Sequence, residues 1–449
     1  MISRPLILPC VVLVLNSIGS LSAQTSGLAP IQTSSLVPTQ LSDGFHSTSP
    51  LSLSAGYDNN FVVGSQALND TVILLTSPTF SWKKSTHRTD FEVDYEPEFE
   101  IFSQHTELNA WNHLAKIHFS HRFNARLTFD AGNSFLATMD PTRQLEDSLL
   151  LLPRGLFRQN LLYAGISYRL DRQTTLHFRF DNAITTMDLP KTLAGVLNQS
   201  SVAGTVSVDR TLNRHHFLTG SYSYLYIVPF HTTAQLNSLA FNQPMHNVDV
   251  GYTYTPNPGL IIRLSGGLIR GPQFGYTAGG SVEKRLARVW LTGGFQRYLS
   301  FFGPLSPAAA GPSSAIPFAQ GVLPGFVYQV ASFGIRGNVT KHLSVNLAGL
   351  NARNDASVRN GNIRSWVARC RADYKLSGRL VAFTQLDFYD QNLNEFSPLP
   401  LSRRRYFGGL QVVLSRPREV IDVPGQSIDN PANSDVPETE APGHGRGDN

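Results

Sequence analysis

The chain of 449 residues has two cysteines, few charged side chains and no long apolar run. Cys10 lies in an N-terminal stretch that reads as a cleaved signal, so the mature chain keeps only Cys370 and no intrachain disulfide is expected. Charged residues are 15% of the chain and the mean hydropathy is −0.13, which fits neither a helical membrane protein nor a disordered one. No segment offers about 18 consecutive apolar residues, so a transmembrane helix is not expected.

Enzyme signatures are also lacking. The sequence contains no Gly-x-Ser-x-Gly, no phosphate-binding loop, and no histidine pair with HExxH spacing. We therefore expect no enzyme, no cofactor and no metal, although a Ser-His pair on the lipid face, of the kind found in outer-membrane lipid hydrolases, stays open. The formal net charge of +5 is small for this length and predicts no nucleic-acid partner.

What the sequence does have is a series of short polar turns, each flanked by runs in which apolar and polar residues alternate. The turns centre on Lys83-Lys84, Asn124-Ala125, Asp171-Arg172, Asn213-Arg214, Asn257-Pro258, Leu286-Ala287, Lys341-His342 and Ser377-Gly378. The connections between these hairpins are mostly longer, and they include 138–157, 187–199, 228–246 and 302–325. Loop length segregated in this way is typical of outer-membrane barrels, with short periplasmic turns and long external loops.

The sequence divides into four segments. Residues 1–23 are predicted to be a signal peptide, residues 24–47 a flexible leader, and residues 417–449 a disordered acidic and proline-rich tail. Residues 48–416 are predicted to form an all-β, antiparallel, up-and-down transmembrane β-barrel of about 18 strands (16 to 18). The predicted location is the outer membrane of a Gram-negative bacterium.

The strictest alternation lies in residues 90–101, where acidic residues take every second position. Glu92, Asp94, Glu96, Glu98 and Glu100 share one face, and apolar residues share the other. A period of two places one face in lipid and the other against the wet lumen. About 18 strands enclose an aqueous channel, so these acidic side chains are predicted to line it.

Basic residues are predicted to face the same lumen from other strands. Alternation through Trp111 and Ile117 turns Lys116 and Arg122 inward, with Lys116 expected opposite Glu96 or Glu98. Further basic residues on the predicted lumen face are Arg126, Arg169, Arg179, Arg263, Arg336, Arg369 and Arg371. Two interpretations remain open: these charges act on passing solutes or polymers, or they form cross-strand pairs that stiffen the wall.

Two other features leave alternatives open. The long connections 138–157 and 302–325 are unusually apolar, and they either fold inward and plug the lumen or dock on the rim. Basic residues also gather at the short turns, where they either contact anionic headgroups or only solvate the turns. Aromatic residues near strand ends fit an interfacial girdle. They are Trp82, Trp111, Tyr298, Tyr374 and Tyr406.

The two ends of the predicted barrel resemble a known family. The segment 51–61, Leu-Ser-Leu-Ser-Ala-Gly-Tyr-Asp-Asn-Asn-Phe, is similar to the opening strand of porin-like barrels found with exopolysaccharide export systems. The segment 405–414, Arg-Tyr-Phe-Gly-Gly-Leu-Gln-Val-Val-Leu, resembles their closing strand. The resemblance implies an outer-membrane barrel linked to polysaccharide secretion, with export components as partners.

Two functions are therefore expected as alternatives. The first is a passive channel for polar solutes or for a secreted polysaccharide. The second is a non-conducting barrel whose loops or tails bind partners in adhesion or assembly. Either barrel would contact outer-membrane lipid and the barrel-insertion machinery. The direction of transport and the oligomeric state do not follow from the sequence.

Overall fold

A computed structural model describes most of the predicted barrel. It describes residues 44–47, 51–59, 69–76, 80–140, 154–188, 198–230, 244–271, 274–299, 327–354, 363–393 and 401–412. The strands are β1 (Gly44–Ser47), β2 (Leu51–Asn59), β3 (Asn69–Thr76), β4 (Phe80–Ser85), β5 (Thr89–Phe102), β6 (Ala110–Arg122), β7 (Leu127–Thr138), β8 (Phe157–Arg169), β9 (Thr174–Met187), β10 (Gln199–Asn213), β11 (His216–Pro229), β12 (Met245–Asn257), β13 (Leu260–Arg270), β14 (Phe274–Leu286), β15 (Val289–Leu299), β16 (Val327–Asn338), β17 (Leu343–Asn354), β18 (Ile363–Lys375), β19 (Leu380–Leu393) and β20 (Leu401–Val412).

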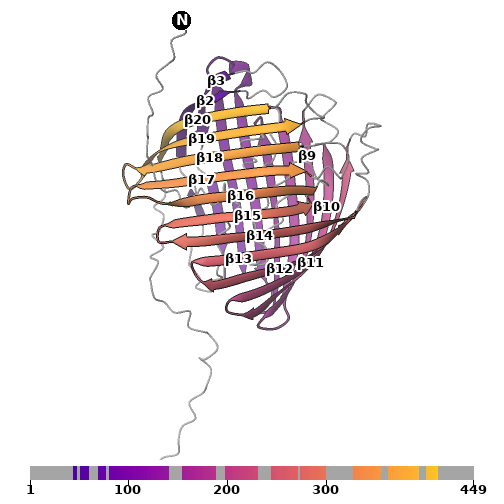
Figure 1. Ribbon diagram of the computed structural model, residues 1–449. Helices are drawn as coiled ribbons and strands as arrows, with labels where there is room; N and C mark the ends of the chain where they lie inside the picture. Colours follow the sequence, from indigo (N-terminus) through magenta and orange to yellow (C-terminus); the bar gives the residue numbers. More distant parts are fainter. Residues whose placement is uncertain are drawn as a thin grey trace, which may run out of the picture. The chain divides into compact units, whose positions relative to one another are not determined.

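All of these strands pair antiparallel in one sheet that closes on itself (Figure 1). From β5 to β20 each strand pairs with the next along the chain, β20 pairs with β2, and β2 pairs with β3. β3 and β4 lie beside different parts of β5, so together they fill one place in the ring. The ring thus holds 18 strands, with β1 as an extra short strand on β4, and the predicted barrel is confirmed.

The tight turns lie at one end of the barrel and the longer connections at the other. β20 ends at the turn end, where β19 begins. β2 begins at the same end, because its first residue, Leu51, pairs with Val412, the last residue of β20. One predicted turn is wrong: Lys83 and Lys84 lie within β4, and Lys83 pairs with Glu92. The chain reverses direction at residues 86–88 instead, because the Thr86 side chain forms hydrogen bonds with the backbone of Thr89 and closes the hairpin there.

Most of the tight turns share one stabilising device. In seven of the eight, a short polar side chain accepts a hydrogen bond from a backbone N–H two or three residues further on, which is how Asn, Asp, Ser and Thr favour turns. These side chains belong to Thr86, Asn124, Asp171, Asn213, Asn257, Thr340 and Ser377. In one of them, the N–H groups of Gln173 and Thr174 donate to Asp171 and lower the pKa of its carboxyl group.

Alternate positions face opposite sides of the wall, as the sequence predicts. The outer face carries large apolar side chains with substantial exposure, such as Leu53, Ile117, Leu264 and Phe333. The inner face carries buried polar and charged side chains. This apolar exterior on a closed ring is the architecture of outer-membrane barrels. Of the five aromatic residues assigned to a girdle, Tyr298 is buried on the inner face beside Tyr328.

Several expectations fall outside the described residues. The signal peptide, residues 24–43 of the leader, the tail 417–449 and the connection 302–325 all lie there. Residues 44–47, at the end of the predicted leader, form β1, which pairs with β4. The described helical element is η1 (Thr106–Leu108), and no described helix has the length and apolar character to span a bilayer.

Candidate functional site

The acidic row lies on β5 with its side chains on the inner face of the wall. On one side β5 pairs with β4 and β3, and on the other with β6. Lys116 lies opposite Asp94, and not opposite Glu96 or Glu98 as predicted. The expected register is wrong by two or four residues, because the chain between β5 and β6 includes η1 and the start of β6 falls at Ala110.

Individual members of the row have different partners. Glu92 forms an ion pair with Lys83 of β4, with Nζ and Oε2 3.1 Å apart. The hydroxyl of Ser81 donates to Asp94. Asn112 of β6 bridges the last two members, because its Nδ2 donates to Glu98 Oε1 at 3.0 Å and to Glu100 Oε1 at 2.9 Å. The row is therefore held to the wall by hydrogen bonds from both neighbouring strands.

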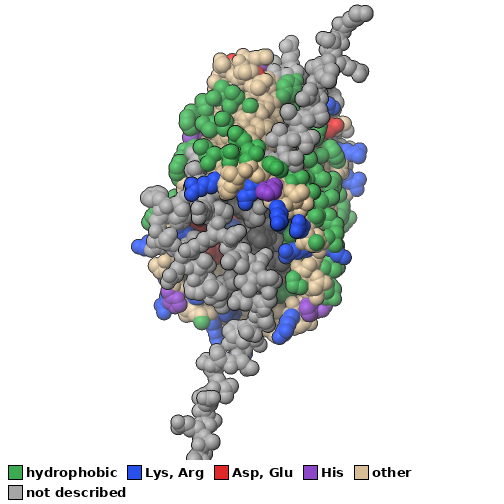
Figure 2. Space-filling model, turned by 90° about the vertical axis from the view of Figure 1, so that its left-hand side faces the viewer, with side chains coloured by type: hydrophobic (Ala, Val, Ile, Leu, Met, Phe, Trp, Pro, Cys, Tyr) green, Lys and Arg blue, Asp and Glu red, His purple; other side chains and the backbone are tan. Residues whose placement is uncertain are grey.

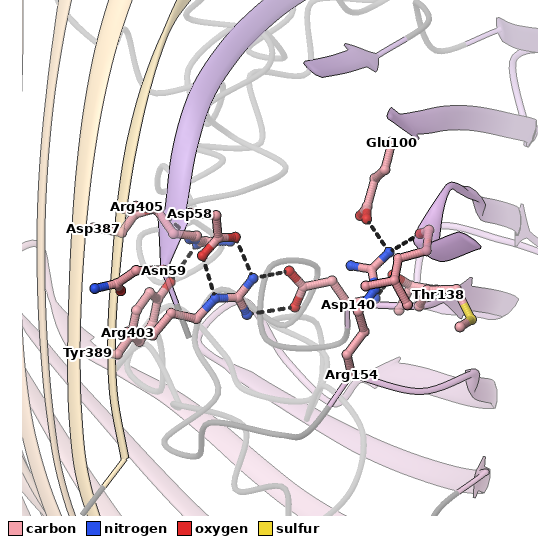
Figure 3. Close-up of polar contacts among 12 residues, drawn as sticks. Asp58, Asn59, Glu100, Thr138, Asp140, Arg154, Asp387, Tyr389, Arg403 and Arg405 are labelled. Carbon is pink, nitrogen blue, oxygen red and sulfur yellow. Dashed lines mark hydrogen bonds and ion pairs between the residues drawn. The ribbon is translucent and has the colours of Figure 1, made fainter. Parts of the chain in front are cut away.

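A second cluster lies around Arg403 of β20 (Figure 3). Arg403 donates to both carboxylate oxygens of Asp58 on β2, at 2.9 and 2.6 Å. It also donates to both oxygens of Asp140, which follows β7, at 3.0 and 2.6 Å. The Arg403 side chain is almost fully buried. One guanidinium thus holds two carboxylates in bidentate geometry, the strong form of this contact.

Arg405 extends this cluster along the same face of β20. Its Nη2 donates to Asp387 Oδ2 and to the Tyr389 hydroxyl, both at 2.8 Å. Arg369 of β18 donates to the other oxygen of Asp387, also at 2.8 Å. The three arginines and the three aspartates therefore balance in formal charge, and Asp387 is shared by two guanidinium groups.

Both ends of the connection between β7 and β8 attach to the inner wall. At one end Asp140 binds Arg403, and at the other Arg154 binds Glu100, with Nη2 and Oε2 2.7 Å apart. Arg154 also donates to the carbonyl of Leu108 at 2.7 Å and stacks on Phe102. Of the two alternatives for the loop 138–157, the described ends fit the inward one. Residues 141–153 lie outside the described residues.

The other predicted lumen residues divide into wall pairs and rim residues. Arg179 binds Asp181 and stacks on Tyr163, whereas Arg371 binds Asp373 and stacks on Phe383. Arg122 is different: it is the last residue of β6 and is exposed at the turn end. Alternation places a residue on a face but does not place it along the barrel axis.

Apart from Arg369, the residues of the Arg403 cluster were not predicted from the sequence. A signal was present, because alternation through the run Arg403-Arg404-Arg405 puts the first and third guanidinium groups on one face. Asp387 and Tyr389 follow the same period on β19. No comparable signal exists for Asp140, because it lies outside a strand and reaches Arg403 only after the ring closes.

A serine and a histidine also meet on the inner wall, which is a different place from the lipid-face Ser-His pair that the sequence leaves open. Ser167 Oγ lies 2.8 Å from His177 Nδ1, and His177 Nε2 lies 3.4 Å from Asp209 Oδ2. Hydrolysis also needs donors for an oxyanion. Ser167 lies within continuous ladders to β7 and β9, which engage the nearby backbone N–H groups. The contact is therefore best described as a cross-strand wall pair.

The described residues contain no group of three or more His, Cys, Asp or Glu side chains suited to a metal ion. Cys370 is a free thiol on the outward face of β18, between Ala368 and Ala372, as alternation predicts.

No protein-family model and no curated protein matches the chain. Solved structures similar to it include a BenF-like porin from Pseudomonas fluorescens Pf-5, with 11% identity over 82% of this chain and 98% of the porin, and a TM-score of 0.45. The outer membrane protein opdK from Pseudomonas aeruginosa has 12% identity over 82% and 98%, with a TM-score of 0.46. The siderophore receptor PirA from the same organism has 9% identity over 83% and 80%, with a TM-score of 0.37.

At these identities and scores the likenesses identify neither a family nor a solute for this chain. The porin-like barrel architecture that the resemblance implies is present in the structure. The two segments that carry the resemblance pair directly with each other, as the first and last strands of the ring. The comparisons give no support to the implied link with exopolysaccharide export.

Proposed function

We propose that this protein is a passive channel for small polar solutes in a bacterial outer membrane. The observation that carries the proposal is the closed 18-strand ring with an apolar outer face and ionised pairs on the inner face. Barrels of this strand number enclose an aqueous lumen. Charged side chains facing such a lumen influence which solutes pass.

The charges near β5 favour cations over anions. The acidic row contributes five carboxylates, and the basic side chains beside it are Lys83, Lys116 and Arg154. The cluster around Arg403 is balanced and adds no net charge. Negative charge on this part of the wall therefore exceeds positive charge, which lowers the energy of a cation near β5 relative to an anion.

Conductance in planar bilayers tests the proposal. Full-length protein added to one side should produce discrete current steps, and the reversal potential in a salt gradient should give the ion preference. Replacing Glu92, Glu96 and Glu98 together with Gln should shift that preference toward anions. A matched triple variant, E107Q/D188N/D390N, removes three exposed carboxylates at the end of the barrel that carries the longer connections, and it should leave the preference nearly unchanged. Equal shifts in both variants would mean that the row does not line the conducting path.

A second candidate function is a non-conducting barrel that serves as a structural, adhesive or assembly partner. The attachment of Asp140 and Arg154 to the inner wall favours it, because these two side chains and their partners occupy space on the inner face that solutes would need. Protein that inserts fully into the bilayer and never opens would support this candidate and reject the channel.

A secreted polysaccharide as the solute is the finer form of the proposal and depends on the family resemblance alone. It predicts that an acidic or neutral polysaccharide added to one chamber blocks the current, whereas a small sugar does not. A channel that conducts and shows no block would leave the small-solute channel intact and remove the polysaccharide.

A further inference from the structure

The turn end of the barrel carries a ring of exposed basic side chains. This basic collar consists of Lys84, Arg88, Arg122, Arg126, Arg169, Arg172, Arg210, Arg214, Lys284, Arg285, Arg288, Lys341 and Arg379. Its members come from seven of the eight hairpins, so they are spread around the ring and not gathered in one sector. Figure 2 shows Lys and Arg side chains distributed over the side of the molecule where hairpins such as β18–β19 turn.

Acidic side chains do not neutralise the basic collar. Among the described residues of these hairpin ends, the exposed carboxylates are Asp90 and Asp171. Ser85 donates to Asp90, and backbone N–H groups donate to Asp171. At the opposite rim, the described exposed charges are less one-sided, with five basic and three acidic side chains. They are Arg158, Arg270, Arg353, Arg364, Arg404, Glu107, Asp188 and Asp390.

The basic collar has a second, repeated feature. In six of the tight turns a large apolar side chain lies exposed within three residues of a member of the basic collar. These apolar side chains are Phe123, Leu170, Leu212, Leu286, Val339 and Leu376, and each is between 46% and 59% exposed. An exposed apolar group beside a cation suits the membrane interface, because the apolar group enters the acyl region while the cation reaches the phosphate level.

We infer that the basic collar binds the headgroups of anionic phospholipids in the leaflet at the turn end. Two observations favour lipid over an acidic protein or a glycan. Lipid surrounds a barrel on every side, which matches the distribution over seven hairpins, and the repeated apolar neighbours have no use in contact with a polar polymer. Attraction of lysine and arginine to an anionic surface extends over about a Debye length, roughly 10 Å at 0.1 M salt.

Spin-labelled lipids provide the test. Full-length protein is reconstituted in phosphatidylcholine vesicles that contain a small fraction of spin-labelled phosphatidylglycerol or spin-labelled phosphatidylcholine of the same chain length. Electron paramagnetic resonance then gives the motionally restricted fraction of each. The wild type should restrict phosphatidylglycerol several-fold in preference, and the preference should fall toward one in high salt. Soluble glycerophosphoglycerol should not compete, because it lacks the acyl chains that the apolar neighbours contact.

Matched variants assign the preference to the basic collar. The variant R126Q/R172Q/R214Q/R288Q removes four of the thirteen basic side chains and should lower the preference measurably, whereas lysine at the same four positions should retain it. The opposite-rim control R158Q/R270Q/R364Q/R404Q removes the same number of charges and should also retain it. A heat-modifiable gel shift selects folded barrels for each measurement. Unchanged preference in the first variant, equal loss in the control, or no salt-dependent preference in the wild type would overturn the inference.

The result of the lipid measurement does not depend on whether the barrel conducts ions. A barrel that never opens can still select anionic lipid, and a conducting barrel can lack any preference.

Discussion

Two neighbouring glycines on β20 have different surroundings. A methyl group added at Gly409 would lie 2.7 Å from the Cα of Ser54 on β2 and would also overlap the carbonyl oxygen of Leu53. A methyl group added at Gly408 would have its nearest neighbour, the carbonyl oxygen of Phe383, at 3.7 Å, which is an ordinary contact. Gly409 therefore allows the first and last strands to approach where the ring closes.

The first prediction concerns this closure. Gly409→Ala should destabilise the folded barrel by about 1–3 kcal/mol, the usual range for overpacking, because the backbone of β2 cannot move aside as a flexible side chain could. The midpoint of urea unfolding in detergent or lipid measures the loss. Gly408→Ala is the matched control and should change the midpoint little. Similar losses in both variants would show that the close approach of β2 and β20 is not the cause.

At the scale of elements, the turn between β14 and β15 is the exception among the eight. It has no short polar side chain that accepts backbone N–H groups, and its Ala287 has a φ of 48°. Ala287 is the one described residue other than glycine with positive φ. An alanine in the left-handed region costs roughly 1–2 kcal/mol.

The second prediction follows from that conformation. Ala287→Gly should stabilise the barrel by about 0.5–1 kcal/mol, because relief of the steric cost exceeds the loss of chain entropy from the added glycine. Ala125→Gly, in the turn between β6 and β7, should do the opposite, because Ala125 has no positive φ to relieve. Urea midpoints of the two variants should therefore move in opposite directions, and movement in the same direction would contradict the explanation.

Elements also show how far the sequence could predict the structure. Alternation assigned the faces of β18 and β20 correctly, because successive residues of a strand point to opposite sides whatever the neighbouring strand does. Register between strands was less predictable. The turn after β4 was placed about three residues early, and Lys116 was matched with the wrong acidic residue, because register depends on which residue closes each turn.

The Arg403 cluster marks the limit of that reasoning. Asp58 and Arg403 are far apart in the chain and become neighbours only because β2 and β20 close the ring. Asp140 is more remote still, since β2, β3, β5 and β6 separate β20 from β7 within the sheet. A period of two cannot predict contacts between residues that meet across the ring.

For the whole molecule, the contact between Asp140 and Arg403 joins two distant parts of the wall (Figure 3). The same guanidinium binds Asp58, which lies on the strand next to β20. Removing either carboxylate leaves Arg403 with one bidentate partner instead of two. Breaking part of a buried ion pair is destabilising, by about 3–5 kcal/mol where a charge is left uncompensated, and less here because one carboxylate remains.

The two carboxylates differ in what they hold, and this difference supports a prediction about conduction. Asp140→Asn releases the start of the β7–β8 connection from β20, so the open channel should show a larger or noisier current. Asp58→Asn removes an equivalent ion pair within the wall and leaves that connection attached. It should lower the urea midpoint to a similar extent without the change in current.

Single-channel recordings of the two variants at equal salt separate the effects. Identical currents in both variants would mean that the contact only stabilises the wall, whereas a change confined to Asp140→Asn would mean that this ion pair sets the width of the conducting path.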